Sequence, residues 1–271
     1  MGQKPNLLSE MSNWVRILNN DKYIYLPDIT QAAGLVRRLL SSRKMLLIVD
    51  DVWETAHSMV FKVGSELCKT VFTTRQPAIA QSIACDSNEI YILEQLDEKY
   101  SLELLSKHAR EVAIKYPKEC KELVLELGGL PLAIRVAGRL LASESVHQWG
   151  VEQFLKELRD DSKAIIESEA PADMTDIAKE TTPTVAALLQ KSTNMLDERT
   201  RKCFAALGPF ASKPATFDVD AMAFVWGIDN PKPIIRELVA RGLLEPVSDG
   251  NYQMHALLVA HARNILAQSE N

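Results

Sequence analysis

The chain has 271 residues, of which 46% are hydrophobic and 25% charged, and its formal net charge is −5. This balance is typical of a globular protein with one large or two modest domains. The acidic surplus provides no general attraction to nucleic acid or to an anionic membrane. Apolar runs stay well below the ~18 residues of a membrane span, and the N-terminus lacks a signal-peptide layout. The sequence therefore predicts a cytoplasmic protein with reduced cysteines.

The first elements expected are two helices, at residues 8–18 and 31–40, followed by the stretch KMLLIVDDVW. Within it, Met45–Val49 is short, aliphatic and not alternating, which predicts a parallel strand buried on both faces. Asp50 and Asp51 follow at the end where open α/β sheets bind ligands. One carboxylate there can hold hydrated Mg²⁺ beside nucleotide phosphates, and a second can orient the attacking water. The alternative is that both cap a helix beginning near Val52.

The stretch CKTVFTTRQPAIA contains a second expected strand, residues 69–72, which should pair in parallel with the first. Arg75 follows this strand, and Pro77 fits the first turn of a helix. On a neighbouring parallel strand, Arg75 could reach a terminal phosphate held near Asp50. The alternative is that Arg75 forms an ion pair with Asp50 or Asp51.

A third strand is expected at residues 90–93, followed by a helix that Asp97 caps. In ELGGLPLAIRVAG, Gly128 and Gly129 end one helix, and Pro131 begins the next because it needs no N–H there. The expected packing face of that helix consists of small and apolar residues: Ala133, Val136, Ala137 and Leu140. Near the C-terminus, LLEPVSDGNYQM predicts a hairpin that turns at Asp249 and Gly250.

Four motifs occur in one order: LLIVDDVW, TVFTTR, GGLPLAIRVAG and YQMHALLVAHARNIL. Together with RKCFAALGPFASKPATF, they resemble the NB-ARC family of STAND signalling ATPases over nearly the whole chain. The resemblance implies an α/β remnant of a P-loop NTPase parallel sheet in residues 1–95 and an all-helical ARC subdomain in residues 96–143. It further implies a polar linker in residues 144–184, with a short helix at residues 149–158, and a winged-helix domain in residues 185–271.

The resemblance also implies roles for single residues. Asp50 would be the Walker B aspartate that holds Mg²⁺ through water, and Asp51 the second, catalytic acidic residue. Arg75 would read the γ-phosphate of ATP. Pro131 would pack near the adenine, and His255 would donate to the β-phosphate of ADP, as an imidazole can. The alternative for His255 is that it caps the final helix.

Two departures from the family pattern stand out. Ala256 replaces the aspartate of the family's MHD motif, and the sequence contains no G-x-x-x-x-G-K-[ST]. Without that motif there is no backbone cradle for phosphates and no lysine for the β/γ oxygens. The N-terminus resembles the segment after the second strand of the family, so we expect a chain truncated before Walker B. Its expected partners are the missing N-terminal and C-terminal segments, or other copies of itself.

Two classes of function compete. The first is an ADP/ATP-binding signal-transduction switch, a slow ATPase in the family, although this chain alone is not expected to be active. The second is a winged-helix DNA-binding transcriptional regulator, for which PKPIIRELVARG, with Lys232, Arg236 and Arg241, is a plausible recognition helix. However, residues 185–271 contain as many acidic as basic residues, whereas DNA readers show a basic surplus. The switch is therefore the favoured function.

Overall fold

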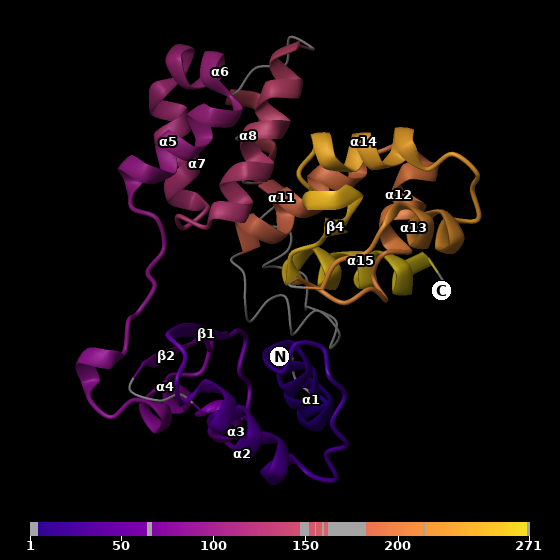
Figure 1. Ribbon diagram of the computed structural model, residues 1–271. Coiled ribbons are helices and arrows are strands. Elements are labelled where there is room, and N and C mark those ends of the chain that lie inside the picture. Colours follow the sequence, from indigo (N-terminus) through magenta and orange to yellow (C-terminus); the bar gives the residue numbers. More distant parts are fainter. Residues whose placement is uncertain are drawn as a thin grey trace. The chain divides into compact units, whose positions relative to one another are not determined.

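A computed structural model describes residues 5–63, 67–146, 152–154, 156–158, 160–161, 183–213 and 215–269. The chain divides into two compact units, Met1–Leu93 and Glu94–Asn271, called unit 1 and unit 2 below (Figure 1). Among the described residues, no helix combines the length and the apolar composition that crossing a membrane requires.

Unit 1 alternates helices with two short strands. Its elements are α1 (Leu7–Leu18), α2 (Ile29–Leu40), β1 (Met45–Val49), α3 (Thr55–Phe61), β2 (Cys68–Phe72), α4 (Pro77–Ile83) and the 3₁₀ turn η1 (Ser87–Glu89). Both N-terminal helices are thereby confirmed, and each begins at a side-chain cap. Asn6 accepts the Ser9 N–H, and Asp28 accepts the Gln31 N–H.

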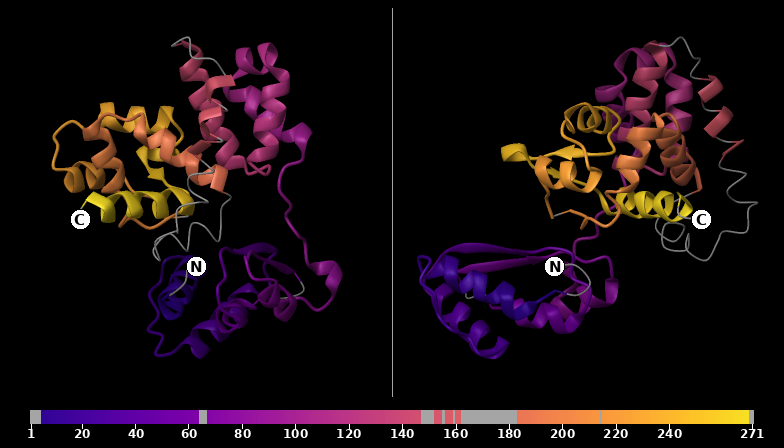
Figure 2. Two further views of the ribbon diagram at one scale, coloured as in Figure 1. Left: turned by 180° about the vertical axis from the view of Figure 1, so that it is seen from behind. Right: turned by 90° about the vertical axis from the view of Figure 1, so that its right-hand side faces the viewer.

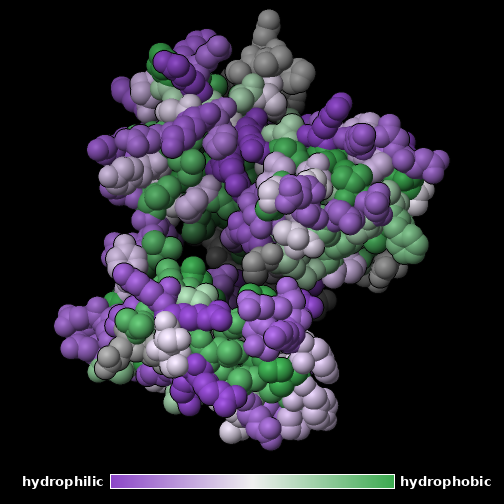
Figure 3. Space-filling model, in the orientation of Figure 1, coloured by the Kyte–Doolittle hydropathy of each residue, from purple (hydrophilic) through white to green (hydrophobic). Residues whose placement is uncertain are grey.

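The sheet of unit 1 confirms the expected parallel pairing, with Met45 opposite Cys68 and Val49 opposite Phe72. Burial of β1 on both faces is wrong: Leu47 is 8% exposed, whereas Leu46 is 60% exposed. The helices of unit 1 lie on one side of the sheet (Figure 2) and cover only that face. Apolar side chains of unit 1 consequently reach the surface (Figure 3).

The third expected strand, residues 90–93, is also wrong, because these residues form no strand. Tyr91, Ile92 and Leu93 are 77–85% exposed. An extended segment becomes a strand only by pairing its backbone. In the described part of unit 1, β1 and β2 pair only with each other, so residues 90–93 have no ladder to join.

Unit 2 is mainly helical. Its elements are α5 (Glu98–His108), α6 (Arg110–Lys115), α7 (Pro117–Glu126), α8 (Pro131–Val146), α11 (Pro183–Asn194), α12 (Glu198–Ala205), α13 (Val219–Trp226), α14 (Lys232–Ala240), β3 (Glu245–Pro246), η3 (Ser248–Gly250), β4 (Tyr252–Gln253) and α15 (Ala256–Ser269). Asp97 caps α5, and the antiparallel hairpin β3–β4 turns at Asp249 and Gly250, both with positive φ, as expected. Residues 152–154 and 156–158 are helical, whereas most of the expected linker lies outside the described residues.

Helix α8 lies at the centre of unit 2. The expected packing face is confirmed, because all four of its residues are at most 1% exposed: Ala133, Val136, Ala137 and Leu140. Gly138 lets α8 approach α5 closely, since a Cβ at this position would lie 2.8 Å from the His108 Cβ. Gly129, with φ +66, is equally constrained, because a Cβ there would lie 2.2 Å from the Leu96 carbonyl oxygen. Close packing therefore requires glycine both at Gly129, before α8, and at Gly138, on the face of α8 that contacts α5.

His261 is a buried titratable group of this core, 7% exposed on α15. Its Nε2 lies 3.0 Å from the Thr193 hydroxyl. Burial, together with the charge of Arg201, lowers the pKa of His261 to about 4, although a hydrogen bond to the Leu189 backbone acts in the opposite direction. The imidazole is therefore neutral in the folded protein near pH 7.

The sheet predicts different costs for two identical substitutions on β1. Leu47→Ala should lower the free energy of unfolding by roughly 2–4 kcal/mol, because it leaves a cavity in the core. Leu46→Ala, the matched control on the exposed face, should cost less than about 1 kcal/mol. Urea denaturation followed by circular dichroism measures both. Equal costs would mean that both faces of β1 are covered.

His261 predicts a loss of stability in weak acid. The pKa of His261 is about 4 in the folded protein, below the ordinary histidine value of 6.5, so the unfolded chain takes up the proton first. Stability is then lost as pH falls from about 6.5 toward 4, by about 2 kcal/mol between pH 7 and pH 5. His261→Gln should remove that part of the pH dependence in urea denaturation, whereas His57→Gln in unit 1 should retain it. A His261→Gln variant that keeps the full pH dependence of the parent would contradict the assignment.

Candidate functional site

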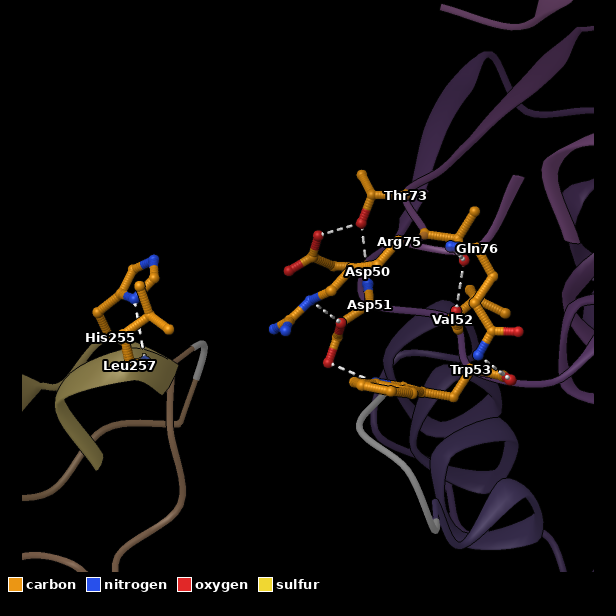
Figure 4. Close-up of polar contacts among 10 residues, drawn as sticks. Asp50, Asp51, Val52, Trp53, Thr73, Arg75, Gln76, His255 and Leu257 are labelled. Atoms are coloured by element: carbon orange, nitrogen blue, oxygen red, sulfur yellow. Dashed lines mark hydrogen bonds and ion pairs between the residues drawn. The ribbon is translucent and has the colours of Figure 1, made fainter. Parts of the chain in front are cut away.

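The carboxyl ends of β1 and β2 lie side by side and bring Asp50 next to Thr73 (Figure 4). The Thr73 hydroxyl donates to Asp50 Oδ1 at 2.5 Å and accepts the Asp51 N–H at 2.9 Å. Backbone hydrogen bonds continue the pairing past the strands, from Thr73 N–H to Val49 C=O and from Val52 N–H to Thr73 C=O. Thr73 thus fixes the position of both consecutive aspartates.

Asp51 faces a second set of partners. Its backbone has φ +57, a left-handed conformation that Asp tolerates better than most residues. Its Oδ1 lies 3.6 Å from Arg75 Nε, and its Oδ2 accepts the Trp53 indole N–H at 2.9 Å. The Arg75 guanidinium lies 5.3 Å from the centroid of the Trp53 ring. Each of these three side chains therefore contacts the other two: Asp51 pairs with Arg75 and accepts from Trp53, and Arg75 makes a cation–π contact with Trp53.

These contacts decide two of the alternatives that the sequence leaves open. The ion pair between Arg75 and Asp51 is confirmed. The helix cap by Asp50 and Asp51 is wrong, because α3 begins at Thr55 and Glu54 occupies its N-cap position. Val52 and Trp53, which belong to no helix or strand, separate the aspartates from Glu54 and the helix. Neither carboxylate therefore caps α3, and both lie at the carboxyl edge of the sheet.

The fit of this site to Mg²⁺ can be tested on its donors. Asp50 is an exposed carboxylate at the end of a parallel strand, which suits a cation held through water. Among the described residues, no group of three or more His, Cys, Asp or Glu side chains could hold a metal ion. The residues present fit Mg²⁺ only if water and phosphate oxygens supply its remaining ligands.

Unit 2 contains a separate pocket of about 310 Å³. Its lining combines apolar residues with three basic side chains: Leu104, Leu130, Pro131, Leu132, Ala133, Arg135, Val185, Lys213, His255 and Leu257. Pro131 and His255, the two site residues that the resemblance implies for this part of the chain, thus line one cavity. They come from the first turn of α8 and from the residue preceding α15.

His255 caps α15, which confirms the second of the two roles that the sequence leaves open for this residue. Its Nδ1 accepts the Leu257 N–H at 3.2 Å, and its carbonyl oxygen accepts from Leu258 and Val259 (Figure 4). An accepting Nδ1 places the proton of the neutral imidazole on Nε2. Capping therefore leaves the ring in a tautomer that can donate a hydrogen bond through Nε2.

A charged cluster borders the same pocket. Glu245 on β3 forms an ion pair with Arg135 of α8, and it lies 3.4 Å from Lys213 Nζ and 3.2 Å from Gln253 Nε2. Burial would raise the pKa of Glu245, but the hydrogen bond and charge of Arg135 and the charge of Lys213 hold it below its usual value. Two cations share one carboxylate, so the cluster has one positive charge in surplus.

Sequence reasoning did not identify five residues that shape these sites: Trp53, Thr73, Arg135, Lys213 and Glu245. Trp53 and Thr73 stand within the motifs LLIVDDVW and TVFTTR, so the motif boundaries could have indicated them. Arg135 stands within GGLPLAIRVAG and is the first polar residue of a helix whose first three turns are mainly apolar. Lys213 and Glu245 carry no local signal, because only the fold brings them together.

Comparison with known proteins identifies one family and several relatives. Residues 7–114 match the family model described as the NB-ARC domain. Apoptotic protease-activating factor 1 of Homo sapiens is 24% identical over 266 residues, which cover 94% of this chain and 20% of that protein. Regulatory protein AfsR of Streptomyces coelicolor is 25% identical over 251 residues, covering 90% and 23%. Disease resistance protein RPV1 of Vitis rotundifolia is 26% identical over 175 residues, covering 61% and 12%. The chain spans less than a quarter of the length of each of these relatives.

The triangle of Asp51, Trp53 and Arg75 can be tested by removing its carboxylate. In Asp51→Ala, the Trp53 indole N–H should exchange faster with solvent and shift its NMR resonance, because it loses its acceptor. The free energy of unfolding should fall by less than about 1 kcal/mol, since Arg75 is half exposed. Glu54→Ala removes a nearby carboxylate that Trp53 does not contact through its indole N–H, and should leave the resonance in place. An unchanged resonance in Asp51→Ala would refute the hydrogen bond.

Proposed function

Because the chain belongs to the NB-ARC family through residues 7–114, we propose that it acts as part of a nucleotide-dependent signalling switch. One observation supports this most directly: the parallel pairing of β1 and β2 places Asp50, Asp51 and Arg75 at the same edge of the sheet. Two acidic residues and an arginine at the carboxyl ends of parallel strands suit the metal and terminal phosphate of a nucleotide.

In unit 1, we assign Asp50 to Mg²⁺, held through water, and Asp51 to the attacking water or its metal-bound neighbour. Thr73 supports this assignment, since its hydroxyl already orients Asp50. Arg75 is assigned to the γ-phosphate. A γ-phosphate would compete with Asp51 for the guanidinium, and a doubly charged phosphate is the stronger partner. The Asp51–Arg75 ion pair would then represent the state without ATP.

In unit 2, we assign Pro131 to the adenine and His255 to the β-phosphate of ADP. The shared pocket and the Nε2-protonated tautomer of His255 support this assignment. Residues 96–143 would be the ARC subdomain and residues 185–271 the winged-helix domain, in which the β3–β4 hairpin is the wing. Ala256 offers no carboxylate beside His255, so any closed ADP state would depend on His255 alone at this motif.

The DNA-binding alternative gains no specific support. On α14, Ile234, Ile235 and Leu238 are buried in the core of unit 2. Arg241, one of the three basic residues of the expected recognition helix, forms an ion pair with Glu237. That pairing leaves two exposed cations of the expected recognition helix, Lys232 and Arg236, for contacts to phosphates.

This chain has no G-x-x-x-x-G-K-[ST], so we expect it to bind ADP or ATP weakly by itself. Isothermal titration calorimetry with Mg-ATP should find a dissociation constant well above 1 μM. Fusing a P-loop strand and helix from an NB-ARC relative in front of the chain should raise the affinity for ADP into the micromolar range, near −8 kcal/mol. Within that fusion, Asp50→Asn should weaken Mg-ATP binding, and His255→Ala should weaken ADP binding.

Lys202→Met, at an exposed ion pair with Glu198, is the matched control for a single charge change in the fusion. It should leave both nucleotide affinities unchanged. A fusion that folds but binds neither nucleotide would overturn the proposed function. Micromolar binding by the unfused chain would instead show that a phosphate cradle exists without the motif.

A further inference from the structure

The sheet of unit 1 has one face that its helices do not cover (Figure 2). The outward side chains of this open face are Leu46 and Ile48 on β1 and Lys69 and Val71 on β2, paired in register across the two strands. Its three apolar side chains are 47–61% exposed. A contiguous exposed apolar patch is typical of a surface that binds a partner.

Charge is distributed unequally along the open face. Side chains alternate along a strand, so the outward row of β1 continues to Lys44 before the strand and to Asp50 after it, and both are exposed. The hydrogen bond from Thr73 N–H to Val49 C=O extends the pairing to the level of Asp50. Lys69 adds a second cation near the amino end. The open face therefore has cations at one end, apolar residues at its centre and a carboxylate at the other end.

Two copies of this face can stack about a two-fold axis in two ways. If the strands of both copies run in the same direction, Lys44 faces Lys44 and Asp50 faces Asp50, and like charges repel each other. If the strands run in opposite directions, Lys44 of each copy faces Asp50 of the other, and Leu46 of each packs against Ile48 of the other. The charge pattern therefore favours the antiparallel arrangement, in which the face is complementary to itself.

We propose that the open face binds a second copy of this chain, with the strands of the two sheets antiparallel. Two Lys44–Asp50 ion pairs, related by the two-fold axis, then flank one shared apolar centre. A surface of uniform charge is a poorer occupant, since one end of the face attracts it and the other end repels it. The inference is independent of the proposed function, because Asp50 contributes only its charge here.

The size of the open face limits the affinity. Each strand has five residues, so the face measures roughly 16 Å along the strands and about 10 Å across them. This area is well below the ~800 Å² per partner of a stable interface. We therefore expect a weak dimer, with a dissociation constant on the order of 100 μM.

The test is sedimentation equilibrium of the full chain from about 10 to 500 μM at low ionic strength, where charge interactions are least screened. The parent should fit a monomer–dimer equilibrium. Ile48→Asn removes an apolar side chain from the centre of the contact and should weaken the dimer at least 10-fold, about 1.4 kcal/mol. Ile17→Asn on α1 is the matched control, because Ile17 is 65% exposed and Ile48 61%, and it should dimerise as the parent does.

Reversal of charge tests the orientation of the two copies. Lys44→Glu should weaken the dimer at least 5-fold, about 1 kcal/mol, because each Asp50 then faces a carboxylate. Adding Asp50→Lys exchanges the two charges and should return the dissociation constant to within about 2-fold of the parent. Lys22→Glu, at an exposed lysine outside the open face, should have no effect. If Ile48→Asn does not fold, these charge variants still decide the outcome.

Several results would overturn the inference. They are a parent chain that stays monomeric at every concentration, equal dimerisation of the parent and Ile48→Asn, or no recovery when Asp50→Lys is added to Lys44→Glu. Growth beyond the dimer would also overturn it, because a closed two-fold contact ends at two copies. A monomer whose Leu46 and Ile48 methyl groups are shielded from a paramagnetic probe in solution would show that the chain covers this face itself.

Discussion

The burial of α8 on nearly all of its sides is the constraint on which unit 2 depends. A helix with apolar residues around most of its circumference must be enclosed by other elements. Helix α8 packs against α5 on one side and α11 on another, and Gly138 permits the close approach to α5. The buried residues from Leu105 to Ile265 consequently form one continuous cluster rather than separate cores.

The exceptions on α8 are as informative as its apolar residues. Arg135 and Arg139, four residues apart and therefore on one face, are only partly buried. Arg135 pairs with Glu245, and Arg139 donates to the carbonyl oxygen of Val239 at the end of α14. Partly buried charges of this kind add little net stability, because the loss of hydration offsets the attraction. They instead fix the direction in which the segment from α14 to β3 lies along α8.

In unit 1, one face of the two short strands contributes Leu47, Val49 and Cys68 to the hydrophobic core, and the ends of the same strands position polar groups. Parallel pairing brings the ends of β1 and β2 to one edge, and the Thr73 hydroxyl connects the two strands there. The helices cover one face of this sheet, so the opposite face presents Leu46, Ile48 and Val71 to solvent. The polar site and the exposed apolar face thus arise from the same small sheet.

The sequence by itself determined the elements whose signals are local. Helix starts at Asp97 and Pro131 follow from capping and from the missing N–H of proline, and the hairpin follows from Asp249-Gly250. The strand β1 and its parallel neighbour were equally readable, since short aliphatic runs ending in polar residues signal such a sheet.

Only the tertiary structure decided what depends on neighbours. Whether β1 is covered on both faces, and whether residues 90–93 form a strand, depends on elements that must lie beside them, and a run of apolar residues does not encode its partner. The meeting of Arg135, Lys213 and Glu245 joins positions separated by up to 110 residues, so no spacing in the sequence could indicate it. The sequence shows two basic residues and one acidic residue, but only the fold places Arg135 and Lys213 beside the single carboxylate of Glu245.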